Sequence, residues 1–331
     1  DILKSILEDP GLPLEEKDSI REWIELVRPH CFDPLPHLTR EERLAHQSHL
    51  APSTFFNGHV IADFGSFIRK GLRGTAQDLQ HWRNRPLTAV QENFYDAMEL
   101  TLQAMSEFIQ RYADLASQLL AENAPGYDPQ QLRHIQAACA NIAHEAPASF
   151  AEALQLVWFL MCFMDYDSFG RYDRYLLAPF ERSRAEGMSE DEALLWLKYA
   201  AIKTEECGGI LNMTIGGHEP DGSCTANPLT RLILRATREM GFRSPNLSLR
   251  IRAEDPDWLW EEARQTLTRG LSLPALYNDA LIMPMLMDLG YSAEDAADYA
   301  LAGCSQVVFP GRSNFACDVG CYNLSKALEL A

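Results

Sequence analysis

The sequence predicts an α/β fold in which a mainly helical first part precedes a part built from alternating strands and helices. Residues 1–205 carry the three- and four-residue periodicity of helices almost throughout. From residue 206 to residue 331, short apolar runs alternate with helical segments, and the connections are short. This repetition is typical of parallel strands joined by right-handed crossovers. We therefore expect an open sheet or a barrel, and we divide the chain into residues 1–205 and 206–331.

The helical part begins with a recognisable start signal. Pro13 is followed by Glu15 and Glu16, which place negative charge in a first helical turn, where it complements the helix dipole. Residues 86–122 should form one long helix, because apolar residues recur along one face. One further helix is expected to start at residue 39, and another is expected to run through residues 64 to 72. Two more are expected at 129–144 and 149–164. The last of these is apolar nearly all round, which indicates a buried helix.

The second part alternates between the two kinds of segment. Strands are expected at 210–215, 246–252, 274–277 and 299–303, and helices at 227–240, 256–269 and 281–289. In parallel folds, reactive groups gather at the carboxyl ends of the strands. The last strand ends at Gly303 and Cys304, and a turn at Pro310 and Gly311 follows. This pattern predicts a thiol displayed at a bend on the carboxyl edge of the sheet.

Composition excludes several classes of function. The net charge of −18 disfavours nucleic acid or an anionic membrane surface as a partner, because both repel an acidic protein. The sequence has no apolar run long enough to span a membrane, no recognisable signal peptide and no glycine-rich nucleotide motif. We expect a cytoplasmic protein. Because the chain starts at Asp1 without methionine and ends within a helical pattern, we expect it to be part of something longer.

The eight cysteines show no disulfide framework. Cys139 and Cys162 lie in helical apolar patterns, which fits a reducing compartment. Cys317 and Cys321 are one helical turn apart, but they lack a CxxC spacing or a histidine partner, so we expect no metal site. Cys304 differs from the others in its place at the end of a strand.

A series of short motifs runs through the chain from about residue 50 to residue 331. The motifs are FNGHVIADF at 56–64, KGLRG at 70–74, SFGRYDRY at 168–175, NMTIGG at 212–217, PNLSLRI at 245–251, PALYND at 274–279, GC at 303–304, PGR at 310–312 and NLSK at 323–326. Taken in this order, they resemble the pyruvate formate-lyase-like domain of the glycyl radical enzymes. The resemblance rests on the ordered set, since no single motif is decisive.

The resemblance implies a ten-stranded α/β barrel made of two half-barrels, with the helical N-terminal region packed around part of it and Cys304 on a central finger loop. It also implies that a glycyl radical, installed by an iron–sulfur S-adenosylmethionine activase, oxidises the Cys304 thiol. The thiyl radical then removes a hydrogen atom from the substrate. No cofactor would be bound directly. The implied partners are a small-molecule substrate, the activating enzyme and a second copy in a homodimer, within anaerobic metabolism.

The family's glycyl loop, an Arg-Val-x-Gly-Tyr motif or similar, has no counterpart in this sequence. A radical cannot be stored without that glycine. We therefore expect that the C-terminal glycyl radical domain is missing from this chain and that these residues alone are inactive. Either the chain is truncated or another chain supplies the glycine.

Departures from the family pattern near Cys304 bear on the reaction. Pyruvate formate-lyase has adjacent cysteines at this site, whereas Gly303 precedes Cys304 here, so formate acetyltransferase activity is not expected. The dehydratases and several decarboxylases carry Gly-Cys-x-Glu, with the glutamate as general base or acid. Gln306 takes that position in this chain. An amide does not transfer protons near neutral pH, although it donates and accepts hydrogen bonds.

Five further residues are candidates for the site. By position, Asp165 and Tyr166 replace a histidine and a serine of the diol dehydratases, so Asp165 is either a relocated base or a hydrogen-bonded structural carboxylate. His59 and Asp318 match substrate-site residues of the dehydratases, although both also fit helix starts. Arg171 either fixes the sheet or binds a carboxylate, phosphate or sulfonate of the substrate.

The leading hypothesis is a glycyl radical lyase that cleaves a C–O, C–C, C–N or C–S bond of a small polar metabolite. One alternative is a radical decarboxylase or C–C bond-forming synthase, since the loss of the glutamate weakens the case for dehydration. Another is a catalytically silent homologue that binds or scaffolds. A cysteine hydrolase ranks third, because no histidine lies near Cys304 in the sequence and His218 is the nearest upstream.

Overall fold

The computed structural model describes residues 17, 53–54, 59–163, 167–207, 211–313, 320–321 and 323–330. Contacts group the chain into two compact units, residues 57–317 and residues 1–56 with 318–331. In the smaller unit, β1 (Ser53–Thr54) pairs antiparallel with β8 (Gly320–Cys321), and α15 (Leu324–Leu330) follows. The predicted division after residue 205 stays a prediction.

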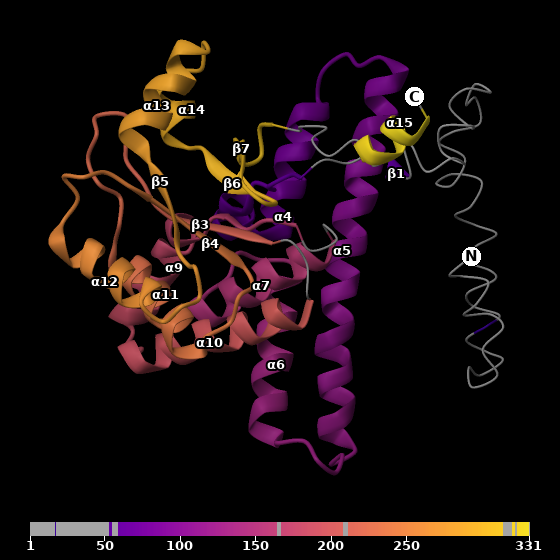
Figure 1. The fold of residues 1–331 in the computed structure, drawn as a ribbon. Helices are drawn as coiled ribbons and strands as arrows, with labels where there is room; N and C mark the ends of the chain where they lie inside the picture. Colours follow the sequence, from indigo (N-terminus) through magenta and orange to yellow (C-terminus); the bar gives the residue numbers. More distant parts are fainter. Residues whose placement is uncertain are drawn as a thin grey trace. The chain divides into compact units, whose positions relative to one another are not determined.

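The first part of the larger unit is helical, as the periodicity predicted (Figure 1). The helix α5 begins with a reciprocal cap, in which the Thr88 side chain accepts from the Gln91 N–H and the Gln91 side chain accepts from the Thr88 N–H. It lies beside α6. In α7, Phe150 and Leu156 are fully buried, in line with its apolar sequence. The helices of this part are α4 (Phe64–Arg83), α5 (Ala89–Ala121), α6 (Pro129–Ile142), α7 (Phe150–Phe163), α8 (Tyr172–Tyr175), α9 (Leu177–Ala185) and α10 (Glu190–Cys207).

Four strands form a parallel sheet in the order β2–β3–β4–β5. The register pairs Met213 with Leu247 and Leu249 with Leu276. Every residue of β3 is buried, which is typical of a parallel strand covered on both faces. The prediction of parallel strands is thereby confirmed. The strands are β2 (Gly170–Arg171), β3 (Asn212–Gly216), β4 (Asn246–Ile251) and β5 (Ala275–Asn278).

Helices follow the strands of the sheet, and the first three of them lie within two residues of their predicted bounds. The chain enters the helix after β3 through Asn227, whose side chain accepts the Leu229 and Thr230 N–H groups. It leaves that helix at Gly241, whose φ of 70° is a left-handed conformation that favours glycine. Among the described residues, no helix is both long enough and apolar enough to cross a membrane. These helices are α11 (Pro228–Met240), α12 (Asp257–Leu267), α13 (Asp279–Asp288) and α14 (Ala293–Ala297).

The last predicted strand does not join the parallel sheet. Strand β6 (Ala300–Ala302) pairs antiparallel with β7 (Gln306–Val308), and the two form a separate hairpin. The chain reverses at Gly303, whose φ of 54° is a left-handed conformation that glycine adopts readily. The expectation that a further crossover brings this strand into the parallel sheet is therefore wrong.

The hairpin also changes the edge at which the cysteine lies. The residue directly before the hairpin, Tyr299, accepts a hydrogen bond through its carbonyl from Arg250, near the carboxyl end of β4. At the other end of β6, the Gly303 carbonyl accepts from Asn212, the first residue of β3. Strand β6 thus runs from the carboxyl edge to the amino edge, and the prediction that Cys304 lies on the carboxyl edge is wrong.

Candidate active site

Cys304 occupies the turn of the β6–β7 hairpin. Ala302 and Gln306 face each other in the register, and Gly303, Cys304 and Ser305 connect them. The Cys304 side chain is exposed. Gln306 is half-buried, and its side-chain oxygen accepts the Ser305 N–H over 3.3 Å. The structure thus presents a thiol at a bend, as predicted, with Gln306 on the strand that leaves it.

Gly303 is fixed through both of its backbone groups. Its N–H donates to Ser168 Oγ over 2.9 Å, and its carbonyl accepts from Asn212 Nδ2 over 3.3 Å. Both partners are fully buried, and Asn212 Oδ1 accepts in turn from the Ser248 hydroxyl over 3.0 Å. A buried polar network whose members find partners holds one geometry. The backbone next to the thiol is therefore rigidly placed, while the thiol itself is exposed.

His59 packs directly against this turn. A Cβ atom on Gly303 would lie 2.1 Å from His59 Cδ2 and 2.3 Å from Nε2, so only glycine fits there. His59 Nδ1 lies 3.3 Å from Asp167 Oδ1, and Asp167 Oδ2 accepts the Val60 N–H over 2.7 Å. Because an ionised carboxylate only accepts, Nδ1 carries the hydrogen of this bond. The Nε2 side of the ring is then the side that meets Gly303.

Asp167 is the functional candidate that the sequence analysis missed. The sequence marks it only as an acidic residue directly before the SFGR motif, close to the candidates Asp165 and Tyr166. Those two residues and Asp318 lie outside the described residues, so their predicted roles stay predictions. The structure brings together Asp167, His59 and the turn that carries the cysteine.

Arg171 lies apart from that turn, at the carboxyl edge of the sheet. It is buried, and it donates to the carbonyls of Gly216 and Ala297 and to the Thr225 hydroxyl over 2.9–3.1 Å. Burial, and the nearby charge of Arg250, lower the pKa of Arg171 to about 10, so the guanidinium stays protonated at neutral pH. Its Nε is buried without a hydrogen-bond partner among the described residues. Arg171 also lines a polar cavity of about 450 Å³, together with Asp63, Arg69, Arg174, Asp298 and Arg312.

A charged cluster occupies the same carboxyl edge. Arg250 Nε and Nη2 donate to the two oxygens of Asp279 over 3.0 and 2.8 Å. The ring nitrogens of His218 lie 2.8 Å from Asp279 and 2.7 Å from Asp255. Burial lowers the pKa of His218, but the hydrogen bonds to the two carboxylates raise it overall. Burial raises the pKa of Asp279, but the bond from His218 and the charge of Arg250 outweigh it and bring this pKa to about 2.

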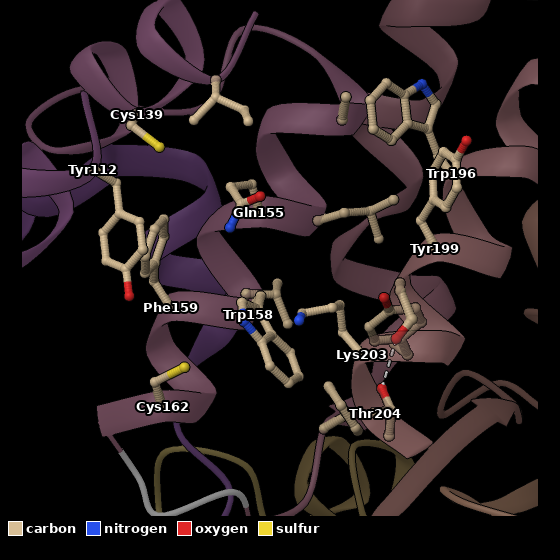
Figure 2. Close-up of a pocket in the computed structure, with 17 residues that line it drawn as sticks. Tyr112, Cys139, Gln155, Trp158, Phe159, Cys162, Trp196, Tyr199, Lys203 and Thr204 are labelled. Carbon is tan, nitrogen blue, oxygen red and sulfur yellow. Dashed lines mark hydrogen bonds between the residues drawn. The ribbon is translucent and has the colours of Figure 1, made fainter. Parts of the chain in front are cut away.

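Figure 2 shows a further cavity, of about 380 Å³, lined by residues of α5, α6, α7 and α10. Its walls are mainly aromatic and aliphatic. Lys203 reaches into it, with Nζ 5.9 Å from the centroid of the Trp158 ring. None of the predicted site residues that the structure describes lines this cavity. We therefore place the candidate active site at Cys304.

The fold and the hairpin define an α/β protein that displays a thiol beside a parallel sheet. The chain belongs to the pyruvate formate lyase-like family, whose model matches residues 15–331. One relative is the isethionate sulfite-lyase of Nitratidesulfovibrio vulgaris, which is 30% identical over 262 residues, covering 72% of this chain and 32% of the relative. The chain thus spans about a third of the length of that curated relative.

Two solved structures share the fold. The glycerol-bound form of the B12-independent glycerol dehydratase from Clostridium butyricum matches with a TM-score of 0.81 and 25% identity, over 96% of this chain and 44% of that chain. A glycyl radical enzyme from Archaeoglobus fulgidus matches with a TM-score of 0.75 and 25% identity, over 93% of this chain and 45% of that chain. The α/β fold is therefore similar to that of the glycyl radical enzymes.

Proposed function

We propose that the protein is a glycyl radical lyase that uses Cys304 to cleave a C–O, C–C, C–N or C–S bond of a small polar metabolite. The observation that carries the proposal is the exposed Cys304 in a rigidly anchored turn, within a chain that belongs to the pyruvate formate lyase-like family. The names of the isethionate sulfite-lyase and the glycerol dehydratase support a lyase that acts on small polar molecules.

The proposed chemistry begins and ends at the Cys304 sulfur. A glycyl radical on a residue outside this chain, installed by an iron–sulfur S-adenosylmethionine activase, supplies the oxidising equivalent. Cys304 gives its thiol hydrogen atom to that radical, and the resulting thiyl radical takes a hydrogen atom from a C–H bond of the substrate. The adjacent bond of the substrate radical then breaks. The product radical takes a hydrogen atom back from the thiol, so that hydrogen atoms and electrons balance over the cycle.

The contribution of this chain is the placement of the sulfur. Ser168 and Asn212 hold the Gly303 backbone, so the thiol keeps a fixed position against a bound substrate. Holding reactants in this way can supply roughly 7–11 kcal/mol of the barrier. We propose that the hairpin is the central finger loop of a ten-stranded barrel, to which residues 1–205 contribute helices and residues 206–331 a half-barrel. A closed wall would keep water and oxidants from the sulfur.

The surrounding residues are proposed to bind the substrate. Asp167 holds the Nδ1 side of His59, so the Nε2 side is the one directed to the substrate near Gly303. Tyr166 and Asp318 are proposed as further substrate-binding residues on the basis of the family resemblance. Arg171, which lies apart from the turn at the carboxyl edge of the sheet, is proposed to bind an anionic group. Support comes from its Nε, which has no hydrogen-bond partner among the described residues, and from the polar cavity that Arg171 lines.

Gln306 favours a reaction in which no proton is transferred at its position. Its amide is neither a useful acid nor a useful base near neutral pH, and in this structure it bonds to the backbone of the turn. This observation favours a radical decarboxylase or C–C bond-forming synthase as the second candidate function. If Asp165 is a relocated base, elimination of water would survive with altered geometry.

The decisive experiment uses the full-length protein after treatment with an activase. Cys304→Ser should abolish turnover and leave the glycyl radical observable by electron paramagnetic resonance, because the activase makes that radical and only the sulfur transfers it to substrate. Cys162→Ser, at a half-buried helical cysteine, is the matched control and should retain turnover. Turnover by Cys304→Ser would remove Cys304 from the mechanism. A wild-type protein that acquires no radical would support the catalytically silent homologue instead.

A second measurement separates the reaction classes. The protein should fail to dehydrate glycerol or propane-1,2-diol if Gln306 has replaced the base. If Asp165 serves as the base, Asp165→Asn should abolish activity, whereas a structural carboxylate would tolerate the change. Efficient diol dehydration that persists in Asp165→Asn would contradict both versions.

We also propose that the activase is a physiological partner and that the protein acts as a cytoplasmic homodimer. The net charge of −18 argues against nucleic acid or an anionic membrane surface as a further partner. Sedimentation of the full-length protein would test the dimer, since a single monomeric species at working concentration would exclude it.

A further inference from the structure

The carboxyl edge of the sheet carries a group of potential metal ligands that the radical chemistry does not use. His218 and Cys224 face each other across an antiparallel bridge that closes the turn at Gly222, so their side chains extend from one rigid loop after β3. Asp255 comes from the turn after β4, where its Oδ2 accepts the Arg252 N–H over 2.9 Å. The ligand atoms of His218, Cys224 and Asp255 lie within 4.8 Å of one another.

The contact between His218 and Asp255 requires a cation. Asp279 Oδ2 lies 2.8 Å from His218 Nδ1, and Asp279 also accepts Arg250 and the Tyr299 hydroxyl. An ionised carboxylate only accepts, so Nδ1 carries a hydrogen. The other ring nitrogen, Nε2, then faces Asp255 Oδ1 at 2.7 Å. A nitrogen lone pair and a carboxylate oxygen at that distance repel unless a proton or a metal ion lies between them.

We propose that His218 Nε2, Cys224 Sγ and Asp255 Oδ1 bind a divalent transition metal ion of the Zn²⁺ class, with solvent as the fourth ligand. Imidazole, thiolate and carboxylate are the ligands that Zn²⁺ takes in proteins, and a three-residue set leaves one position open. His218 and Asp255 are buried, whereas Cys224 is half-buried, which gives the ion a path from solvent. Asp279 is the carboxylate that orients the ligand histidine.

The distances fit this ion after a small adjustment. Bonds of about 2.0–2.3 Å in a tetrahedral site place neighbouring ligand atoms roughly 3.3–3.7 Å apart. The 2.7 Å separation of His218 and Asp255 would open by roughly 0.6–1 Å, and the Cys224 sulfur already lies within 4.8 Å of both atoms. Cys224 is half-buried, so its thiol has room to adjust to the bond distance.

Binding of the metal ion in place of protons also leaves the net charge of this buried cluster unchanged. Without metal, the cations of Arg250 and His218 balance the anions of Asp255 and Asp279. A divalent ion replaces the proton of the imidazolium and the proton of the Cys224 thiol, so the net charge stays the same. Uncompensated charge is costly in such a place, and this substitution creates none.

The proposed site does not depend on the proposed function. It joins the loop after β3 to the turn after β4, whereas Gly303 and the thiol next to it lie at the amino edge of the sheet. The sequence does not reveal the site, because a histidine and a cysteine six positions apart, with an aspartate much later in the chain, match no common metal motif.

The test uses Co²⁺, a spectroscopic substitute for Zn²⁺, added to protein that has been freed of metal with a chelator. We expect one Co²⁺ per chain, a thiolate-to-cobalt charge-transfer band in the near ultraviolet and the intense visible bands of a four-coordinate site, all removed by added Zn²⁺. Cys224→Ser should lose the thiolate band. Cys304→Ser, which removes the exposed thiol of the candidate active site, is the matched control and should keep it.

Asp279→Asn serves as a second variant, because it changes an orienting group and leaves the three ligands in place. It should weaken Co²⁺ binding roughly 10–100-fold while the thiolate band persists at saturation. A wild-type protein without the thiolate band, or a band that survives in Cys224→Ser, would overturn the proposal. Zn²⁺ should also raise the melting temperature of the wild-type protein and leave that of Cys224→Ser unchanged.

Discussion

Arg250 is the group on which the carboxyl edge of the sheet depends most. Its side chain is fully buried, and its guanidinium lies 3.7 Å from the centroid of the Tyr299 ring. It donates to both oxygens of Asp279 and, through Nη1, to the carbonyls of Ala297 and Tyr299 over 2.9 and 2.7 Å. Arg250→Met keeps much of the volume and removes every one of these donors.

These contacts determine how much the free energy of unfolding falls in Arg250→Met. Removing one partner of a buried ion pair costs about 3–5 kcal/mol, because the remaining charge stays buried. The Tyr299 carbonyl, left without this donor, adds about 1–3 kcal/mol, whereas the Ala297 carbonyl keeps its hydrogen bond from Arg171. These contributions overlap, and His218 still faces Asp279, so we expect the free energy of unfolding to fall by about 4–6 kcal/mol. That is a large part of the roughly 5–15 kcal/mol by which domains are stable.

Urea unfolding followed by circular dichroism measures this loss. Arg312→Met is the matched control, since Arg312 pairs with Asp295 and Asp298 at the surface and should lose only about 0–1 kcal/mol. Asp279→Asn in the Arg250→Met background should recover part of the loss, because it removes the uncompensated charge. A loss for Arg250→Met no larger than that of the control would refute the reasoning.

Two further predictions concern the turn. Gly303→Ala should lower the free energy of unfolding by more than Gly126→Ala. Both glycines have positive φ, which costs alanine about 1–2 kcal/mol, but of the two only Gly303 would place the new Cβ against His59. Equal losses in urea unfolding would contradict the contact. Asp167→Asn should release the tautomer of His59, because an amide can donate to Nδ1 as well as accept from it. Nitrogen NMR of the ring should show a mixture of tautomers, and an unchanged spectrum would remove Asp167 as the group that positions His59.

Much of the fold could be predicted because its signals are local. The helix after β3 was expected within a residue of Pro228–Met240, since Asn227, a proline at the first position and Gly241 mark its ends. Three of the four parallel strands were also placed within a residue or two, whereas the two-residue strand β2 was not expected. Hydrophobic runs and caps are encoded in neighbouring residues, so a single sequence suffices to find them.

The edge at which Cys304 lies could not be predicted in this way. A three-residue apolar run has the same pattern whether it extends a parallel sheet or forms one arm of a hairpin. Which of the two forms depends on β7, which pairs with β6. It also depends on Ser168 and Asn212, which come from distant segments and form hydrogen bonds with Gly303. Proximity of this kind is set by tertiary packing.

The same limit applies to the candidate site. His59 was a candidate only through family resemblance, and no histidine lies near Cys304 in the sequence, yet the fold places the His59 ring against Gly303. Asp167 was missed because its role appears only when the chain brings it to His59. The grouping of His218 with Asp255 depends in the same way on two adjacent parallel strands.

Strand β6 sets the position of the Cys304 thiol, because both of its ends are anchored. It is tied at its start, where Arg250 binds the carbonyls of Ala297 and Tyr299, and at its end, where Ser168 and Asn212 hold Gly303. One extra residue between these anchors would have to be absorbed as about 3.3 Å of strand, with the side chains beyond it turned to the opposite face. The position of the Cys304 sulfur is thus set by the length of β6 between these anchors. Because a strand changes only by whole residues, that position cannot be adjusted gradually.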